Sequence, residues 1–253
     1  MEAEAKLEAV DLEAFYGAER VLKRLRIPLV QGAVTAVIGP SGSGKTTLLR
    51  CLSRMHELTS GARVQGAVLL DGMNIYDPAV DASAVRRRVA TIAAKPNPFP
   101  SMSVRENVLS GLTLSGIRAQ DAESIVESCL HEVGLWDQIK DRLRIPATAL
   151  STVEQQQLCI ARSLALRPEV ILLDEPCSVL DPMATARIED LMHDLRERYT
   201  LGIATHSMQQ AARVSDHVAF VLSGELIEYS DTDRLFTRPS DVRTEDYLTG
   251  RFG

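Results

Sequence analysis

Cysteine is scarce in this chain, and its few cysteines are scattered. The 253-residue sequence holds four, and no two of them form a C-x-x-C pair. This spacing indicates neither a zinc site nor a disulfide framework, because both need paired or regularly spaced cysteines. We expect all four to be reduced thiols, most of them buried as small apolar side chains. They are Cys51, Cys129, Cys159 and Cys177.

An excess of basic residues is also lacking. Twenty-eight lysine and arginine residues against thirty-four aspartate and glutamate residues give a formal net charge of -6. Domains that bind nucleic acid carry a basic patch or stripe. The balance therefore disfavours a nucleic-acid partner, and we predict none.

Long apolar runs are absent as well. No stretch approaches the roughly 20 apolar residues that cross a bilayer. Residues 1–10 are acidic, where a secretory signal would begin with basic residues. We therefore expect a soluble protein that stays in the cytosol.

The apolar pattern changes along the chain, which has neither internal repeats nor low-complexity segments. Alternating residues over 7–15 and 21–29 predict an antiparallel hairpin, and helical spacing over 101–166 predicts a helical insert. From residue 167 on, strands alternate with helices, which is typical of a mainly parallel sheet. We predict one α/β domain over 1–253, with a core at 1–100 and 167–253 and a helical subdomain at 101–166.

One eight-residue segment fits the phosphate-cradling pattern G-x-x-x-x-G-K-[ST]. It consists of Gly39, Pro40, Ser41, Gly42, Ser43, Gly44, Lys45 and Thr46. An apolar run precedes it and a helical pattern from Thr47 follows, which is the strand, loop and helix context that the motif requires. The glycines let backbone N–H groups turn inward around an anion. We predict that Lys45 neutralises the outer phosphates of a nucleoside triphosphate and that Thr46 ligates magnesium.

A pair of carboxylates follows the short apolar run 170–173. Asp174, at the end of a buried strand, can hold magnesium through water, and Glu175 can orient or deprotonate the attacking water. A helix-start pair is the alternative interpretation, but a place downstream of a phosphate loop favours the catalytic one. His206, just past the next predicted strand, can reach the terminal phosphate and the same water as a neutral imidazole. The other four histidines, His56 among them, are expected on helix or strand surfaces without chemistry.

Together these residues resemble the ATP-binding-cassette (ABC) ATPases, and the resemblance covers nearly the whole chain. It implies a P-loop core with a mainly parallel sheet, an N-terminal antiparallel part and a helical subdomain, and it implies ATP and Mg²⁺ as cofactors. It also implies a dimer in which the signature of one subunit, which includes Ser151 here, closes on the terminal phosphate held by the other.

Tyr16 fits the aromatic residue that stacks on adenine, Asp181 lies in the D-loop, and His206 fits the switch histidine. The predicted catalytic residues are Lys45, Glu175 and His206; the predicted metal ligands are Thr46 and Asp174; the predicted nucleotide contacts are residues 39–47, Tyr16, Ser151 and Asp181.

Five further segments are similar to the phosphate-import subgroup of this family, and several of them have no general nucleotide-binding role. They are residues 95–100, 155–162, 174–178, 208–216 and 244–253. The subgroup implies an ATP hydrolase that is peripheral on the cytoplasmic face of a bacterial inner membrane. It docks beneath two membrane-spanning permease partners and drives the uptake of inorganic phosphate.

Two departures from the family pattern fall at functional positions. Ala93 and Ala94 stand where the family has Phe-Gln, so the Q-loop glutamine is absent. Thr152 and Val153 replace the two signature glycines, and Glu154 adds negative charge. Loss of one preorganised donor to a developing anion costs about a hundredfold to a thousandfold in rate. We predict ordinary ATP binding with slow hydrolysis as a homodimer.

The altered segments leave alternatives open. The chain is a degenerate half that pairs with an intact subunit in a heterodimer, or it was altered deliberately at dimer and partner contacts, or it tolerates the changes. Two other functions compete with the importer subunit. An ATP-binding regulatory or sensor module is favoured by the lost glycines. A non-transport ATPase would carry a second cassette or a basic insert, and this sequence has neither.

Overall fold

A computed structural model describes residues 4–118 and 120–251. The chain forms two compact units. The first combines residue 4 to Thr91 with Glu169–Glu175 and with Arg196 to residue 251, and the second combines Ile92–Pro168 with Pro176–Leu195. Among the described residues, no helix has the length and apolar character needed to span a membrane.

The larger sheet of the first unit is mainly parallel. Its order is β10-β9-β3-β8-β7-β6, and β3 pairs in parallel with both β8 and β9. The strands are β3 (Val34–Ile38), β6 (Val89–Ile92), β7 (Val170–Asp174), β8 (Thr200–Thr205), β9 (His217–Leu222) and β10 (Glu225–Asp231). Every residue of β3 and β8 is buried, as expected of central strands covered on both faces. The expected parallel core is confirmed.

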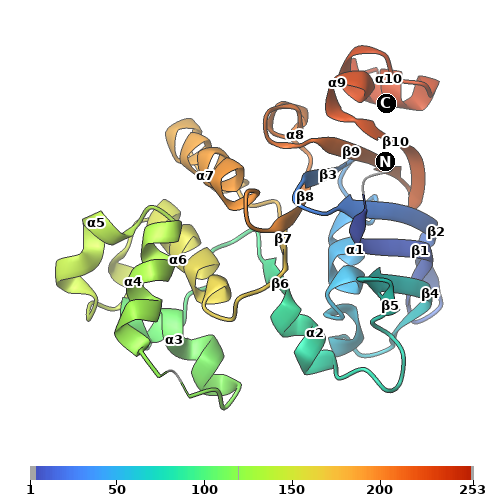
Figure 1. Ribbon diagram of the computed structural model, residues 1–253. Helices are drawn as coiled ribbons and strands as arrows, with labels where there is room; N and C mark the ends of the chain where they lie inside the picture. The colour runs from blue at the N-terminus through green and yellow to red at the C-terminus, as the bar shows by residue number, and fades with distance from the viewer. Residues whose placement is uncertain (1–3, 119, 252–253) are drawn as a thin grey trace. The chain divides into compact units, whose positions relative to one another are not determined.

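The second sheet of this unit is antiparallel and has the order β2-β1-β4-β5. Its strands are β1 (Ala5–Tyr16), β2 (Glu19–Val30), β4 (Ala62–Leu70) and β5 (Met73–Asn74). The expected hairpin is β1 with β2, whose register pairs Tyr16 with Glu19. Figure 1 shows this sheet in blue and teal beside α1.

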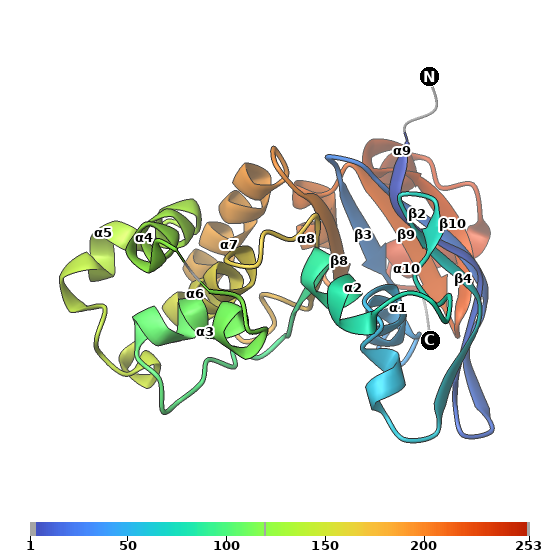
Figure 2. The ribbon, with the colours of Figure 1, turned by 60° about the horizontal axis from the view of Figure 1, so that its bottom comes forward.

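Helix α1 (Lys45–Leu52) contacts strands of both sheets, among them β1 and β8. Its buried leucines join the apolar core that both sheets share. The other helical elements of this unit are η1 (His56–Leu58), α2 (Ala82–Arg88), α8 (Met208–Val214), α9 (Thr232–Thr237) and α10 (Val242–Leu248). Figure 2 turns the molecule so that α1 comes into view among the strands.

The second unit is helical. It contains α3 (Val104–Leu114), α4 (Ala122–Glu132), α5 (Trp136–Ile139), η2 (Lys140–Arg142), η3 (Ala147–Ala149), α6 (Thr152–Leu164) and α7 (Pro182–Leu195). Helix α6 contacts α3, α4 and α7, and its buried face includes Leu158 and Ala161. This unit begins earlier than the predicted insert at 101–166 and also takes in α7, because contacts between α6 and α7 join segments that are separate in sequence. The assignment of the whole chain to one domain stays a prediction.

Candidate nucleotide-binding site

The predicted phosphate loop connects β3 to α1, and its glycines are needed for close packing. Gly39 has a φ of 151°, and a Cβ atom placed on it would lie 2.1 Å from the carbonyl oxygen of Val221 in β9. Gly44 has a φ of 101°, and a Cβ atom there would lie 2.6 Å from Cδ2 of Leu22 in β2. Any side chain at either position would therefore collide with backbone or core. The glycines let the loop lie directly against both strands.

The end of the loop presents polar groups that suit an anion. Helix α1 begins after Gly44 without a side-chain cap, and its first turn holds no acidic residue. The first N–H groups of such a helix carry a partial positive charge. The buried hydroxyl oxygen of Ser43 has no hydrogen-bond partner among the described residues. This donor set fits a phosphate group.

Lys45 is bound to the loop from which its helix starts. Its Nζ atom donates to the carbonyl oxygens of Gly39 at 2.8 Å and Pro40 at 3.1 Å, and the residue is buried. Burial lowers the pKa of Lys45, and the carboxylates of Glu175 and Asp174 oppose that shift. The ammonium group is therefore fixed where phosphate oxygens would compete for it as acceptors.

Thr46 and Asp174 lie in direct contact. The Thr46 hydroxyl donates to Oδ1 of Asp174 at 3.0 Å and so joins the start of α1 to the end of β7. Burial raises the pKa of Asp174, whereas the bond from Thr46 opposes the rise. The structure thus brings the two predicted metal ligands together.

Glu175 occupies a strained backbone conformation beside His206. Its φ is 49°, and its N–H donates to the carbonyl oxygen of Ala204 in β8 at 2.8 Å. Left-handed φ values cost a non-glycine residue on the order of 1 kcal/mol or more. Oε2 of Glu175 lies 2.6 Å from Nδ1 of His206. The backbone bond to β8 holds Glu175 in the conformation that pairs it with the histidine.

Tyr16, at the end of β1, packs against His56, whose predicted surface position is wrong. His56 was expected on a surface, but it is completely buried. Its ring meets that of Tyr16 edge-on, with centroids 4.6 Å apart, and its Nε2 donates to the carbonyl oxygen of Phe15 at 3.1 Å. Burial lowers the pKa of His56. Helical spacing cannot reveal such a residue, because η1 is only one short turn and its position under β1 is set by the fold.

Two predicted nucleotide contacts, Ser151 and Asp181, belong to the helical unit. Ser151 caps α6 in a reciprocal arrangement in which its hydroxyl donates to Oε2 of Glu154 at 2.7 Å, and Glu154 Oε2 also accepts from the Ser151 N–H at 2.7 Å. Asp181 accepts a hydrogen bond from the N–H of Ala184 at the start of α7. The Ser151 hydroxyl is thus engaged by the residue that departs from the family signature.

The altered Q-loop retains a backbone contact to α6. The Gln156 side-chain amide, which is fully buried, donates to the carbonyl oxygen of Ala93 at 3.2 Å. The Gln156 Oε1 atom has no partner among the described residues. Ala94 itself offers no polar side-chain atom. The contact fixes the backbone at this position but replaces none of the missing glutamine's chemistry.

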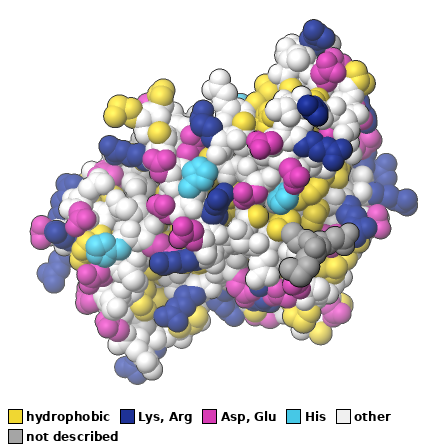
Figure 3. Space-filling model, turned by 45° about the horizontal axis from the view of Figure 1, so that its top comes forward, with side chains coloured by type: hydrophobic (Ala, Val, Ile, Leu, Met, Phe, Trp, Pro, Cys, Tyr) yellow, Lys and Arg dark blue, Asp and Glu magenta, His cyan; other side chains and the backbone are white. Residues whose placement is uncertain are grey.

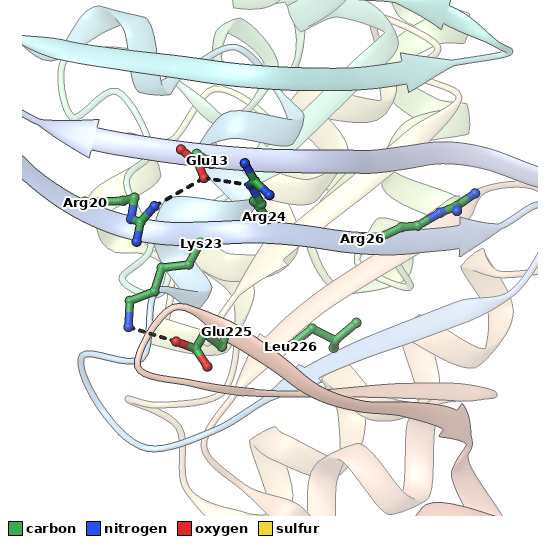
Figure 4. A pocket seen from close by; sticks show the side chains of 7 residues that line it. All are labelled: Glu13, Arg20, Lys23, Arg24, Arg26, Glu225 and Leu226. Atoms are coloured by element: carbon green, nitrogen blue, oxygen red, sulfur yellow. Dashed lines mark hydrogen bonds and ion pairs between the residues drawn. The ribbon is translucent and has the colours of Figure 1, made fainter.

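A separate surface pocket of about 440 Å³ lies between β2 and the β9–β10 turn, and no sequence pattern indicated it. Figure 4 shows Arg20 and Arg24 directed at Glu13, and Lys23 directed at Glu225. The remaining lining residues are Arg26 and Leu226. Because the cations already have carboxylate partners, we assign this pocket no ligand. Figure 3 likewise shows acidic and basic side chains interspersed on one face of the molecule.

Comparison with known proteins identifies the group to which this site belongs. Residues 22–178, which include the phosphate loop and both carboxylates, match the ABC transporter family. The chain belongs to that family. It is an ABC ATPase, and the nucleotide for its phosphate loop is accordingly ATP.

Two similar proteins extend this finding. The phosphate import ATP-binding protein PstB of Pseudoalteromonas translucida (strain TAC 125) is 52% identical over 248 residues, which cover 98% of this chain and 90% of that protein. CbiO1 of Clostridium perfringens, described as part of the ABC transporter complex CbiONQ, has a TM-score of 0.80 at 24% identity and covers 98% of this chain and 97% of its own. The second likeness concerns the fold alone, and it agrees with the predicted ABC ATPase architecture.

Proposed function

We propose that this chain is the ATP-binding, energy-coupling subunit of a bacterial importer for inorganic phosphate. The observation that carries the proposal is the 52% identity to a phosphate import ATP-binding protein across 98% of the chain. Two segments outside the nucleotide motifs support it further, residues 95–100 and 244–253. Both are similar to the phosphate-import subgroup, and neither has a general role in binding ATP.

The contacts in the first unit support roles for the predicted site residues that lie in this unit. Lys45 binds the outer phosphates, and Thr46 with Asp174 supplies the hydroxyl and carboxylate oxygens that Mg²⁺ prefers as ligands. The metal, when bound, neutralises charge on the phosphate oxygens. Glu175 orients or deprotonates the attacking water, and His206, whose Nδ1 lies 2.6 Å from the Glu175 carboxylate, reaches the terminal phosphate and the same water. Tyr16 stacks on the adenine ring, and the edge-on contact with His56 supports the Tyr16 ring.

The proposed partners and location rest on the similarity to the phosphate import ATP-binding protein. We propose that the chain docks beneath membrane-spanning permease subunits on the cytoplasmic face of the bacterial inner membrane, and that it pairs with a second ABC ATPase subunit. No nucleic-acid partner is proposed. We retain the assignment of one nucleotide-binding domain, with a core at 1–100 and 167–253 and a helical subdomain at 101–166.

Hydrolysis is proposed to be slow when two copies of this chain pair with each other. The Ser151 hydroxyl is already donated to Glu154, whose charge repels a phosphate, and Thr152 and Val153 carry side chains where the family has glycine. A heterodimer would keep one competent site, made from this chain's phosphate loop and Glu175 and from the partner's signature. The second candidate is a sensor that binds ATP without useful turnover. The hydrogen bond from the Ser151 hydroxyl to Glu154 favours this function as well.

A mixing experiment tests the proposal. Calorimetry on the purified chain should detect Mg-ATP binding, and the chain alone should turn over ATP slowly. Equal amounts of this chain and an intact phosphate-import homologue, reconstituted with permease subunits, should restore ATPase activity and phosphate uptake. Restored ATPase activity supports the coupled subunit, and continued absence of ATPase activity supports the sensor. Absence of any heat of Mg-ATP binding by folded protein would exclude both.

A further inference from the structure

The turn between β9 and β10 contacts the phosphate loop, although no step of the nucleotide chemistry described above uses it. The turn consists of Ser223 and Gly224, whose φ values are 48° and 80°. Two successive positive φ values are typical of the tight turn that joins antiparallel strands. Ser223 is exposed, as expected of a turn, but Gly224 is buried. Its burial indicates that the turn packs against other parts of the first unit.

Gly224 joins the phosphate loop to β2. Its N–H donates to the carbonyl oxygen of Ser43 in the loop at 3.0 Å, and its own carbonyl oxygen accepts from the N–H of Lys23 in β2 at 2.8 Å. A Cβ atom placed on Gly224 would lie 2.0 Å from the carbonyl oxygen of Val21. Glycine is therefore needed here both for its positive φ and for the close approach of three backbone segments.

An ion pair joins the same two segments on the outside of the turn. Nζ of Lys23 lies 3.1 Å from Oε1 of Glu225, the first residue of β10, and Figure 4 shows the two side chains directed at each other. Both side chains are partly exposed, so solvent screening keeps the contribution of this pair small. The backbone bonds of Gly224 are therefore the main connection between β2, the turn and the loop.

The bond from Gly224 fixes the direction of the peptide group that joins Ser43 to Gly44. This peptide bond is trans, so its C=O and its N–H point in nearly opposite directions. Because the turn holds the Ser43 carbonyl oxygen, the Gly44 N–H is directed away from the turn. Gly44 immediately precedes α1, whose first N–H groups form the anion-binding end of the loop. The turn thus sets the direction of a donor at the start of that helix.

We propose that Gly224 is a positioning residue for ATP: its backbone holds the Ser43–Gly44 peptide in the direction that offers the Gly44 N–H to the triphosphate. This rests on the proposed function and deepens it, since it assigns the β9–β10 turn to the site that binds ATP. A loop that is held in place before the nucleotide arrives loses less conformational entropy on binding. Loosening the turn should therefore weaken ATP binding while the protein stays folded.

The test compares Gly224→Ala with the wild-type full-length chain and with Gly72→Ala. Gly72 is a matched control, since it lies in the turn between β4 and β5, follows a residue of positive φ, Asp71, and has a φ of 75° itself. A Cβ atom on Gly72 would meet no atom within 4 Å. Both variants place alanine at a strained φ, but only Gly224→Ala presses on β2 and the loop.

The readout is the amide of Lys45, the residue after Gly44. Gly44-Lys45 is the only Gly-Lys pair in the sequence, so ¹³C′-glycine with ¹⁵N-lysine labelling isolates this amide as a single NMR signal. A second pair of variants, at the exposed Ser223, keeps the test decisive if Gly224→Ala does not fold. Valine is disfavoured at positive φ and asparagine tolerates it, so Ser223→Val should loosen the turn and Ser223→Asn should retain it.

We expect Gly224→Ala and Ser223→Val to shift the Lys45 signal and to weaken Mg-ATP binding about threefold to tenfold in calorimetry, the factor that corresponds to one backbone hydrogen bond. Gly72→Ala should lower the melting temperature but change neither quantity, and Ser223→Asn should match the wild type. An unmoved Lys45 signal with unchanged ATP affinity in Ser223→Val, or equal changes in Gly72→Ala, overturns the inference. Failure of the wild-type chain to bind Mg-ATP would instead count against the proposed function, and the Lys45 signal would still decide whether the turn positions the loop.

Discussion

At the scale of single residues, the site depends on polar groups that burial and neighbours hold in one state. Lys45, Asp174 and His56 all have pKa values shifted by burial toward the uncharged form. Glu175 is held at a positive φ by its backbone bond to β8 and pairs with His206. Perturbed titration and backbone strain are common at functional sites, and Lys45, Asp174 and Glu175 show them beside the phosphate loop.

Glu175→Gln should strongly slow turnover while leaving ATP binding intact. Glutamine has nearly the same volume and tolerates the same φ, but it cannot accept a proton from water. General-base catalysis contributes about a hundredfold to ten-thousandfold, so kcat should fall by that range in a mixture with an intact homologue that supplies the signature. Steady-state phosphate release measures kcat, and calorimetry measures the Mg-ATP affinity. Glu197→Gln, at an exposed position, serves as the control, and a kcat within twofold of wild type in Glu175→Gln would contradict the assigned role.

His56→Phe should remove a pH dependence of stability and weaken support for Tyr16. Burial holds the pKa of His56 in the folded protein below the ordinary value for histidine, so the unfolded chain takes up a proton more readily and stability is lost as pH falls below about 6.5. The variant lacks this titration, although leaving the Phe15 carbonyl without its donor should lower the free energy of unfolding by about 1–3 kcal/mol. Denaturant unfolding at pH 5.5 and 7.5 checks both statements. His193→Gln, on an exposed part of α7, should leave the pH dependence unchanged.

At the scale of elements, the decisive feature is how helices begin. Helix α1 begins without a side-chain cap, which leaves its N–H groups for an anion, whereas α6 begins with a complete capping box. In the proposed function, these two starts form the two halves of a composite site shared between subunits. One is open to phosphate, and the other is satisfied within its own chain.

Restoring the signature should raise the activity of the homodimer. The triple variant Thr152→Gly, Val153→Gly and Glu154→Gln removes both branched side chains and the charge, while glutamine can still serve in the capping box. We expect kcat to rise by at least tenfold in the chain assayed alone, since each recovered donor to a developing anion is worth about a hundredfold or more. Glu154→Gln alone isolates the charge. Equal kcat values for the triple variant and the wild type would show that the signature does not limit turnover.

At the scale of the whole molecule, an ion network joins the two sheets of the first unit. Glu169, just before β7, pairs with Arg88 and with Lys6 of β1, and both cations also pair with Asp71 after β4. The bonds from Arg88 and then Lys6 lower the pKa of Glu169 to about 2. The network connects segments far apart in sequence, so it forms only when both sheets are in place.

Glu169→Gln should flatten the acid end of the stability curve. A carboxylate whose folded pKa is depressed contributes stability above its unfolded pKa of about 4.3, and that contribution is lost as pH falls toward 2. Because the side chain is 36% exposed, solvent screening limits the difference at pH 7 to about 1 kcal/mol or less. Melting temperatures of wild type and variant from pH 7 to pH 2.5 should converge as pH falls. A constant offset between them over that range would contradict the expectation.

Much of the fold could be predicted because its signals are local. The hairpin of β1 and β2 and the buried strand β7 each follow from a contiguous run of residues. The helices α9 and α10 were not predicted. Each is about two turns or less and is held by contacts with β9 and β10 rather than by its own periodicity.

The sequence by itself determined the phosphate loop, its carboxylates and the family, because glycine conformation and motif spacing are properties of a short window of chain. Only the tertiary structure decided that His56 lies beneath Tyr16 and that Glu175 pairs with His206. Those pairs come from strands and helices that meet only after the sheets have formed. Their energies depend on burial and distance, and neither is encoded by spacing along the chain.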